Sequence, residues 1–291
     1  MSKPLSVIIP ALNEAEGIGP TLERIKIVAQ AQGWDLELIV VDDGSTDQTG
    51  EKARAAGATV IRHPANGGYG LSLQDGIKAA RHPYIAITDA DGTYPIEELP
   101  KIYSMVVDQG YDMAVGARTG TEYKKGLLKY PARILFRLLA EYVAGRRIPD
   151  INSGLRVMRR EKLLPHLSRT CLGFSFTTSI TLIFFLNGFF VGYTPIDYAV
   201  RMGKSKVKHI KDTLRTTQIM VSVISHYNPL KLFLLIAIVC LLAAFAAAFL
   251  GWLIGNVWLG WCSAALVAAA PICFALGCMS ENVRLSNERS A

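Results

Sequence analysis

Residues 84–92 read Tyr-Ile-Ala-Ile-Thr-Asp-Ala-Asp-Gly, and this stretch decides the fold class. It opens with a short apolar run that predicts a buried β-strand. Asp89 and Asp91 follow where the run stops, and Gly92 lets the backbone turn. Two carboxylates held this close repel each other, so such a pair usually holds a cation that faces another anionic group. Oxygen ligands favour Mg²⁺ or Mn²⁺, whereas a solvated acidic turn is the alternative reading.

Similar apolar runs alternate with helical patterns on both sides of this stretch. The expected strands span residues 5–9, 36–41, 59–61, 84–88 and 113–115, and the expected helices span residues 14–32, 47–56, 71–80 and 96–109. This alternation predicts an α/β domain with a buried parallel sheet. In open sheets of this kind, ligands bind beyond the carboxyl ends of the strands. We therefore expect the site in the loops that follow the first four strands.

The loops after the first three strands are polar or rich in glycine. They read Pro10-Ala11-Leu12-Asn13-Glu14, Asp42-Asp43-Gly44-Ser45-Thr46-Asp47 and Asn66-Gly67-Gly68-Tyr69-Gly70. We expect the second loop to leave Asp42 and Asp43 exposed, where they can accept hydrogen bonds from a base or a ribose. The glycines of the third loop would let the backbone approach a phosphate. Turn formation and helix capping are the alternative roles, and we assign a capping role to Asp47.

The C-terminal part of the chain contains a long uncharged stretch. No Asp, Glu, Lys, Arg or His occurs from residue 232 to residue 280. A helix needs about 20 apolar residues to cross a bilayer core, so residues 229–280 are expected to form two transmembrane helices. We place these helices near residues 231–253 and 257–279, with a turn at residues 255–260. A buried hairpin in a soluble core is the alternative, but soluble helices usually keep a polar face.

Basic residues flank the uncharged stretch on both outer sides, and its turn has none. They are Lys204, Lys206, Lys208, Lys211, Arg215 and Lys231 before it, and Arg284 and Arg289 after it. This asymmetry predicts that both termini face the cytoplasm. The N-terminus lacks the apolar region of a signal peptide, so we expect residues 1–208 to form a cytosolic domain. The expected location is the cell (inner) membrane, with multiple passes and a cytosolic tail at residues 281–291.

Two segments combine basic charge with an apolar helical face, at residues 123–143 and 209–228. Helices of this kind lie on membrane surfaces, although an ordinary surface helix packed on the core is the alternative. The second segment leads directly into the first expected crossing. The formal net charge of +7 is divided between clusters at residues 124–147 and 201–215. This division favours anionic lipid headgroups over nucleic acid as the partner.

Together the motifs resemble a known family. PALNE, VDDGSTD, NGGYG and DADGTYP stand in the order and spacing of the GT-A glycosyltransferases of family 2. Within that family they are most similar to the group of dolichol-phosphate mannose synthases and polyprenyl-phosphate glycosyltransferases. The resemblance covers residues 5–208. It implies a GT-A (Rossmann-like) nucleotide-sugar-binding domain, Mg²⁺ or Mn²⁺ as cofactor, and a UDP- or GDP-linked sugar as donor.

The resemblance also implies roles for individual residues. Asp89 and Asp91 would border the diphosphate as catalytic residues, with Asp91 as the principal metal ligand. The residues implied to hold the nucleotide sugar are Pro10, Leu12, Asn13, Glu14, Asp42, Asp43 and Ala90. Gly116-Ala117-Arg118 resembles the group's GSR motif, residues 152–156 its SGFR motif, and Arg201 with residues 203–206 its basic loop. Arg118 and Arg201 would act as catalytic cations, and the residues implied to meet the acceptor phosphate are Arg133, Ser205 and Lys206.

One position departs from the family pattern. Where many members have Asp-Leu-Gln-His-Pro-Pro, this chain has Asp91-Gly92-Thr93-Tyr94-Pro95-Ile96, so Thr93 replaces a side-chain amide that helps to bind the metal. We therefore expect the metal to depend more on Asp89, on water or on Thr93 itself as ligands. The Gln-x-x-Arg-Trp motif of processive polysaccharide synthases is absent, which disfavours polymer synthesis.

These observations predict a metal-dependent, inverting transferase that moves one sugar, glucose or mannose, to a polyprenyl phosphate at the cytosolic membrane face. A lipid monophosphate arrives ionised, so it calls for basic residues rather than a catalytic carboxylate. One alternative is a different membrane acceptor, such as a glycerolipid. Another is a non-catalytic scaffold that binds nucleotide sugars at the membrane. Small residues are frequent in the two C-terminal helices, which also suits a homo-oligomer.

Overall fold

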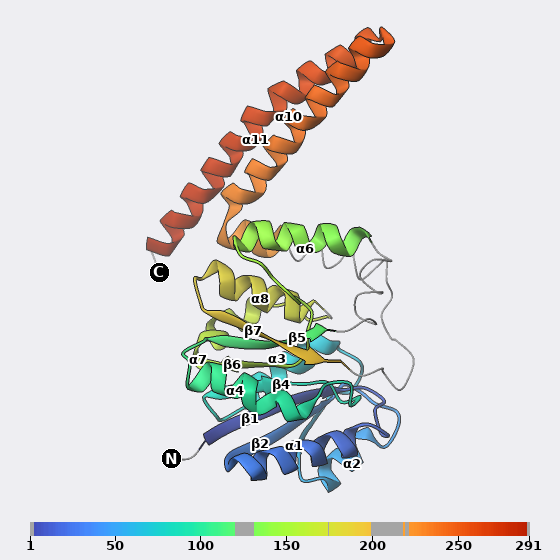
Figure 1. The fold of residues 1–291 in the computed structure, drawn as a ribbon, viewed down its shortest axis with the longest axis vertical. Helices are drawn as coiled ribbons and strands as arrows, with labels where there is room; N and C mark the ends of the chain where they lie inside the picture. The colour runs from blue at the N-terminus through green and yellow to red at the C-terminus, as the bar shows by residue number, and fades with distance from the viewer. Residues whose placement is uncertain (1–2, 120–130, 174, 199–217, 219–220, 290–291) are drawn as a thin grey trace. The chain divides into compact units, whose positions relative to one another are not determined.

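The computed structural model describes residues 3–119, 131–173, 175–198, 218 and 221–289. The chain divides into two compact units, Met1–Ile219 and Met220–Ala291. The first unit is an α/β domain, and the second contains two long helices (Figure 1). Each unit is described by itself below.

The first half of the α/β unit alternates strands and helices as predicted. The elements are β1 (Lys3–Ala11), α1 (Ile18–Gln32), β2 (Trp34–Asp42), α2 (Thr49–Ala55), β3 (Thr59–Arg62), α3 (Tyr69–Ala79) and β4 (Tyr84–Ile87). Strand β1 pairs in parallel with both β2 and β4, and β2 pairs in parallel with β3. The carboxyl ends of these four strands therefore lie along one edge of the sheet, which brings the four predicted loops together.

The second half of the unit contains the strand predicted at residues 113–115 and two strands that the sequence pattern did not predict, at residues 156–159 and 191–197. The elements are η1 (Ile96–Glu98), α4 (Leu99–Val107), β5 (Met113–Thr119), α6 (Pro131–Ala144), β6 (Arg156–Arg159), α7 (Arg160–Leu163), η2 (Leu164–Arg169), α8 (Phe176–Leu186) and β7 (Val191–Asp197). The order in the sheet is β3-β2-β1-β4-β6-β5-β7. Strand β6 is antiparallel to β4 and to β5, whereas β7 is parallel to β5. The sheet is therefore mixed rather than wholly parallel.

Helices cover both faces of this sheet. Val7 and Ile9 of β1 point into a core shared with α1 and α4, whereas Ile8 points into a second core shared with α3 and α8. All three side chains are completely buried. Burial on both faces explains why the strands read as continuous apolar runs instead of alternating with polar residues.

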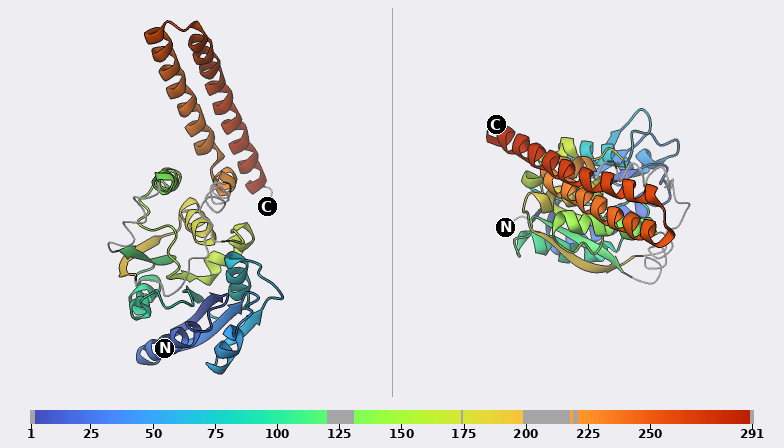
Figure 2. Two further views of the ribbon diagram at one scale, coloured as in Figure 1. Left: turned by 90° about the vertical axis from the view of Figure 1, so that its right-hand side faces the viewer. Right: turned by 90° about the horizontal axis from the view of Figure 1, so that it is seen from above.

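The second unit contains α10 (Pro229–Ile254) and α11 (Val257–Arg289), which run side by side in both views (Figures 1 and 2). Both helices are long and apolar enough to cross a membrane, as predicted. Only 11% and 17% of their most apolar windows are buried, so neither resembles the core helix of a soluble protein. The turn is shorter than expected, because Gly255 ends α10 with a φ of 66° and α11 begins at Val257.

Close packing between the two helices depends on small residues. Ala237, Ala244 and Gly251 recur at intervals of seven along α10, and all three are buried. A Cβ at Gly277 of α11 would lie only 2.7 Å from the Cβ of Phe233. Helix α11 also continues to Arg289, beyond the predicted end at residue 279. Of the predicted interface helix at residues 209–228, residues 218 and 221–227 are helical, and the others before Asn228 lie outside the described residues.

Candidate functional site

The loops that follow β1 and β2 are joined by hydrogen bonds. Asn13 has a φ of 50°, and its backbone N–H donates to Ser45 Oγ at 2.9 Å. Its side-chain Oδ1 accepts a hydrogen bond from the N–H of Thr46 at 2.8 Å. The N–H of Glu14 donates to Thr49 Oγ1 at 2.8 Å. Of the residues predicted to bind the nucleotide sugar, Pro10 is buried within β1, Leu12 and Glu14 are half-buried, and Asn13 is exposed.

Asp42 differs from the sequence expectation, because its carboxylate is completely buried rather than exposed. Its Oδ1 accepts a hydrogen bond from the N–H of Ser45 at 2.9 Å, and Arg62 Nε lies 3.8 Å from Oδ2. Helix α2 packs directly on this side chain, since a Cβ at Gly50 would lie 2.6 Å from Oδ2. The buried carboxylate of Asp42 therefore stabilises the conformation of the second loop.

Asp43 is also buried, with 4% of its surface exposed, so the expected exposure is wrong for this residue too. Its Oδ1 accepts a hydrogen bond from the N–H of Gly67 at 2.8 Å, and its Oδ2 accepts one from the N–H of Gly68 at 2.9 Å. His63 Nδ1 lies 2.7 Å from Oδ1, and His63 Nε2 lies 3.3 Å from a carboxylate oxygen of Asp75. Asp43 thereby fixes the glycine-rich turn that begins α3, a role that sequence spacing did not indicate.

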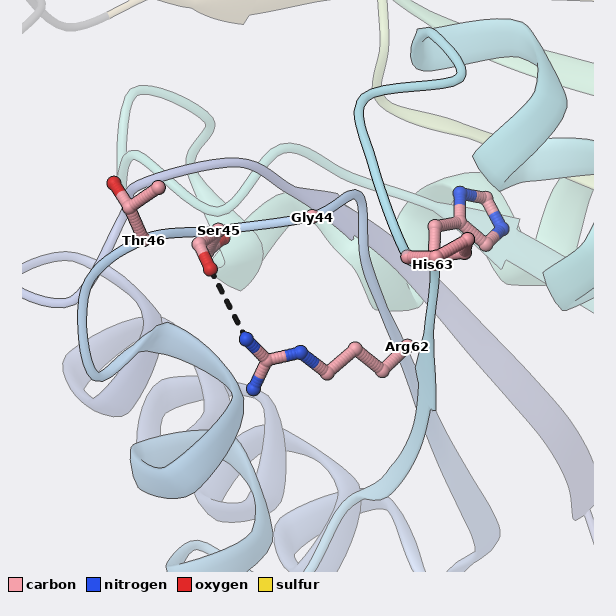
Figure 3. Close-up of a pocket in the computed structure, with 6 residues that line it drawn as sticks. Gly44, Ser45, Thr46, Arg62 and His63 are labelled. Carbon is pink, nitrogen blue, oxygen red and sulfur yellow. Dashed lines mark hydrogen bonds between the residues drawn. The ribbon is translucent and has the colours of Figure 1, made fainter.

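An open pocket of about 420 Å³ lies beside the second loop (Figure 3). The residues that line it are Gly44, Ser45, Thr46, Arg62, His63 and Pro64. Arg62 donates a hydrogen bond from Nη2 to the carbonyl oxygen of Ser45 at 3.2 Å. Gly44, Ser45 and Thr46 belong to the predicted second loop, but none of the lining residues is among those assigned an individual role from the sequence.

Asp89 and Asp91 lie half-buried just beyond the end of β4. The hydroxyl of Tyr69 donates a hydrogen bond to Asp89 Oδ1 at 3.1 Å. Asp91 Oδ1 accepts hydrogen bonds from the hydroxyl of Thr93 at 2.7 Å and from its N–H at 3.2 Å. Thr93 is 1% exposed, so its side chain is committed to orienting Asp91. Ala90 is buried between the two carboxylates, and its carbonyl oxygen accepts a hydrogen bond from Thr21 Oγ1 at 3.2 Å.

The acidic pair fits Mg²⁺ or Mn²⁺ by its donor chemistry. Both side chains offer hard carboxylate oxygens, which these ions prefer. Within the described parts of the chain, no group of three or more His, Cys, Asp or Glu side chains could hold a metal ion. In phosphate-binding sites Mg²⁺ is commonly bound by one or two carboxylates, with water and the phosphate oxygens of a substrate as its other ligands, and the pair Asp89 and Asp91 fits that pattern.

Arg118 is held by a buried carboxylate that the sequence reading missed. Its Nε and Nη2 donate hydrogen bonds to the two oxygens of Asp150 at 2.7 and 3.0 Å. The side chain of Arg118 is 17% exposed and that of Asp150 only 1%. The guanidinium also lies over the ring of Tyr198, 5.4 Å from its centre. Tyr198 packs edge-on against Tyr94 of the acidic loop, which is defined as residues 88–95 between β4 and η1. Arg118 is thus positioned near the acidic loop.

The segment that leads into β6 packs against the acidic loop. The N–H of Gly154 donates to the Tyr94 hydroxyl at 2.6 Å, and a Cβ at Gly154 would lie 3.2 Å from Asp89 Oδ1. Arg156 is fully buried and donates to the carbonyl oxygen of Ser153 at 2.6 Å and to Thr181 Oγ1 at 3.1 Å. Burial lowers the pKa of Arg156. Its guanidinium therefore joins this segment to α8 by hydrogen bonds and has a structural role.

Comparison with known proteins identifies the domain that carries this geometry. Residues 6–167 match the family described as glycosyl transferase family 2. The chain belongs to glycosyltransferase family 2. The predicted family resemblance and the predicted GT-A fold are both confirmed.

Two similar proteins come from Haloferax volcanii. A dolichyl-phosphate hexose transferase is 32% identical over 205 residues, which cover 70% of this chain and 86% of that protein. The low-salt glycan biosynthesis hexosyltransferase Agl6 is 32% identical over 223 residues, which cover 74% of this chain. The chain spans about half of Agl6, 52% of its length. A dodecaprenyl-phosphate galacturonate synthase from Rhizobium johnstonii is 29% identical over 161 residues, 53% of this chain and 47% of that protein.

Solved structures of other glycosyltransferases share the fold. Glucosyl-3-phosphoglycerate synthase from Mycobacterium tuberculosis, in complex with Mn²⁺, UDP and glucosyl-3-phosphoglycerate, superposes with a TM-score of 0.63. The match covers 76% of this chain and 80% of that one at 20% sequence identity, which establishes the GT-A fold alone.

Several residues predicted for this family 2 protein fall outside the described structure. Arg201, Ser205 and Lys206 belong to residues 199–217, which lie outside it. Arg133 belongs to α6, but its side chain is outside the described part. The roles assigned to these four residues, like those of the other predicted site residues, stay predictions. The structure does bring together Asp89, Asp91, Arg118 and the loops after β1 and β2.

Proposed function

We propose that this protein transfers a single sugar, glucose or mannose, from a nucleotide-diphosphate sugar to a polyprenyl phosphate with inversion at the anomeric carbon. The observation that carries the proposal is the half-buried pair Asp89 and Asp91 at the carboxyl end of β4, in a family 2 domain joined to two apolar helices. The names of the dolichyl-phosphate and dodecaprenyl-phosphate relatives support the acceptor class.

On the donor side, Asp91 and Asp89 would hold Mg²⁺ or Mn²⁺. The ion would neutralise charge that develops on the departing nucleotide diphosphate. The residues proposed to hold the nucleotide sugar come from the ends of β1 and β2 with their following loops and from the loop after β4. They are Pro10, Leu12, Asn13, Glu14, Asp42, Asp43 and Ala90. Because Asp42 and Asp43 are buried, we assign them to holding the loops in shape around the nucleotide.

On the acceptor side, the chain's own cations have the main role. A polyprenyl phosphate is already ionised, so it can attack the anomeric carbon directly without a strong general base. We assign Arg118, Arg133, Arg201, Ser205 and Lys206 to the phosphate groups. Asp150 keeps Arg118 in place for this task through their paired hydrogen bonds.

Helix α6 supports a membrane-surface location for the domain. Ile134, Leu138 and Tyr142 recur at intervals of four, and 38%, 52% and 37% of their surfaces are exposed. An exposed apolar stripe of this kind suits the boundary between headgroups and acyl chains. We propose that α6 rests on the cytosolic membrane surface, with α10 and α11 crossing the inner membrane and both termini in the cytoplasm.

A charge on this stripe is expected to impair use of the lipid acceptor. In Leu138→Glu, the carboxylate would have to enter the interface, so the KM for polyprenyl phosphate should rise about tenfold while the KM for the donor stays unchanged. Steady-state kinetics in vesicles measure both constants. Ile27→Glu is the control, because Ile27 is 60% exposed on α1 at the opposite end of the α/β unit (Figure 1). Equal effects of both substitutions would contradict the role of α6.

The proposed reaction is tested with radiolabelled nucleotide sugars. Purified protein is incubated with polyprenyl phosphate, Mg²⁺ or Mn²⁺ and each of several UDP- and GDP-sugars, and label is counted in the butanol-extractable lipid. We expect label from one donor, and we expect chelation of the metal to abolish transfer because two carboxylates alone cannot replace the ion's charge. Readdition of the metal should restore transfer.

Two other results would change the assignment. Transfer to a glycerolipid but not to polyprenyl phosphate would redirect the proposal to another membrane acceptor. Nucleotide-sugar binding without transfer to any lipid would favour the non-catalytic scaffold. Asp89 and Asp91, which would hold a metal cation, lie at the same edge of the sheet as the cation Arg118. This arrangement favours the enzyme, since a scaffold that only binds nucleotide sugars needs no cations to stabilise a transition state.

A further inference from the structure

Tyr69 connects the glycine-rich loop to the acidic pair. It is the first residue of α3, and its hydroxyl donates to Asp89 Oδ1 at 3.1 Å. In the NGGYG motif the glycines suggest a role near phosphate, whereas nothing in the sequence assigns a role to the tyrosine. The contact joins residues that are 20 positions apart and that follow two different strands.

The start of α3 is fixed from two sides, so Tyr69 has little freedom to move. On one side, Asp43 accepts the N–H groups of Gly67 and Gly68, the two residues that precede Tyr69. On the other side, the N–H of Leu71 donates to the carbonyl oxygen of Leu172 at 2.9 Å. Gly70 packs so tightly there that a Cβ would collide with the carbonyl oxygen of Cys171. These contacts therefore hold the phenol of Tyr69 in place beside Asp89.

The direction of this hydrogen bond is also fixed. An ionised carboxylate has only acceptor oxygens, so the phenol O–H of Tyr69 is the donor and Asp89 Oδ1 is the acceptor. Asp91 receives a comparable hydrogen bond from the hydroxyl of Thr93. Each carboxylate of the pair is thus oriented at Oδ1 by a neutral hydroxyl group.

We propose that Tyr69 is a positioning residue that orients the Asp89 carboxylate for binding of the divalent cation. This inference rests on the proposed function, because the cation belongs to the donor site described there. It connects three loops physically, since Asp43 after β2 fixes the glycine-rich turn after β3, that turn places Tyr69, and Tyr69 orients Asp89 after β4. Loss of a partner that orients a metal-binding side chain typically lowers metal affinity about 10- to 100-fold.

The test measures Mn²⁺ binding rather than turnover. Full-length Tyr69→Phe and wild-type proteins in detergent are titrated with Mn²⁺ in the presence of UDP or GDP, and free Mn²⁺ is followed by electron paramagnetic resonance. We expect the Kd for Mn²⁺ to rise about 10- to 100-fold in Tyr69→Phe, as for loss of a partner to a metal ligand. Tyr103→Phe is the control, because the Tyr103 hydroxyl is also largely enclosed but bonds to the carbonyl oxygen of Pro4 at 3.4 Å.

A double variant separates positioning from a general effect on structure. If Tyr69 acts through Asp89, then Tyr69→Phe should weaken Mn²⁺ binding little further in an Asp89→Asn background. Unchanged Mn²⁺ affinity in Tyr69→Phe, or losses that multiply in the double variant, would overturn the proposal. Failure of the wild-type protein to bind Mn²⁺ with either nucleotide would instead overturn the proposed metal site itself, so the two failures are distinguishable.

Discussion

Asp91→Asn is expected to abolish sugar transfer while leaving the domain folded. Asparagine has nearly the same shape as aspartate and keeps an oxygen that can accept the hydrogen bonds of Thr93. It lacks the negative charge that holds a divalent cation. Metal stabilisation of a leaving phosphate contributes several kcal/mol, so kcat should fall by about three orders of magnitude. The measurement is kcat at saturating donor and acceptor, with circular dichroism as the check of folding.

Asp108→Asn provides the matched control for this substitution. Asp108 is an exposed carboxylate at the C-terminal end of α4, and its loss removes the same charge from the protein. We expect Asp108→Asn to keep wild-type kcat. If Asp91→Asn also kept it, Asp91 could not be the principal metal ligand. A wild-type protein that binds nucleotide sugar but shows no turnover would direct attention to the scaffold alternative.

Most of the sheet was predictable because its central strands are buried on both faces. Val7, Ile8 and Ile9 are all enclosed, and such runs leave a clear signal in the sequence. Strand β6 leaves no such signal, because it is only Arg156–Arg159 and has an arginine at each end. Arg156 is buried there because its guanidinium donates to the nearby carbonyl oxygen of Ser153 and also to groups of α8 that are distant in the sequence, including the carbonyl oxygen of Thr177 at 3.3 Å. A local pattern cannot show such partners.

The position of the site was predictable for a topological reason. Parallel strands gather their carboxyl ends at one edge, so loops that are distant in sequence had to converge. The partners of each side chain could not be predicted in the same way. Asp43 reaches Gly67 and Gly68, and Asp150 reaches Arg118, across 24, 25 and 32 positions of the chain. These contacts depend on how helices and loops pack on the sheet, which sequence spacing does not specify.

The two C-terminal helices were predictable from composition, whereas the positions of their ends were not. The uncharged stretch predicted both helices, because apolar length alone decides whether a helix can cross a bilayer. Their ends depend on individual residues. Gly255 adopts a left-handed conformation that ends α10, and Asn256 Oδ1 accepts the N–H of Trp258 at 3.0 Å as α11 begins. Helix α11 then continues past the apolar region, where Arg284 donates to Glu281 at 2.6 Å.

Asp150→Asn is expected to destabilise the α/β unit strongly. The substitution leaves the Arg118 guanidinium, only 17% exposed, without its buried counter-charge. It also places an amide NH₂ group against hydrogen-bond donors, since both oxygens of Asp150 face Arg118 and Oδ1 also accepts the N–H of Asn152 at 3.1 Å. Breaking a buried ion pair costs about 3–5 kcal/mol, and we expect about 3 here because Arg118 is partly hydrated. Chemical denaturation of the purified protein, followed by near-ultraviolet circular dichroism, measures this change.

The exposed pair between Arg24 and Glu97 is the control that isolates burial. Its N–O distance of 2.7 Å equals that of Arg118 and Asp150, but 36% and 61% of the two side chains are exposed. Glu97→Gln should cost at most about 1 kcal/mol, because water solvates the arginine that is left behind. Because the two N–O distances are equal, a difference between the two losses in the free energy of unfolding would come from the surroundings of each pair. Equal losses in the two variants would show that Arg118 recovers solvent when Asp150 is changed, and would argue against its fixed position beside the acidic loop.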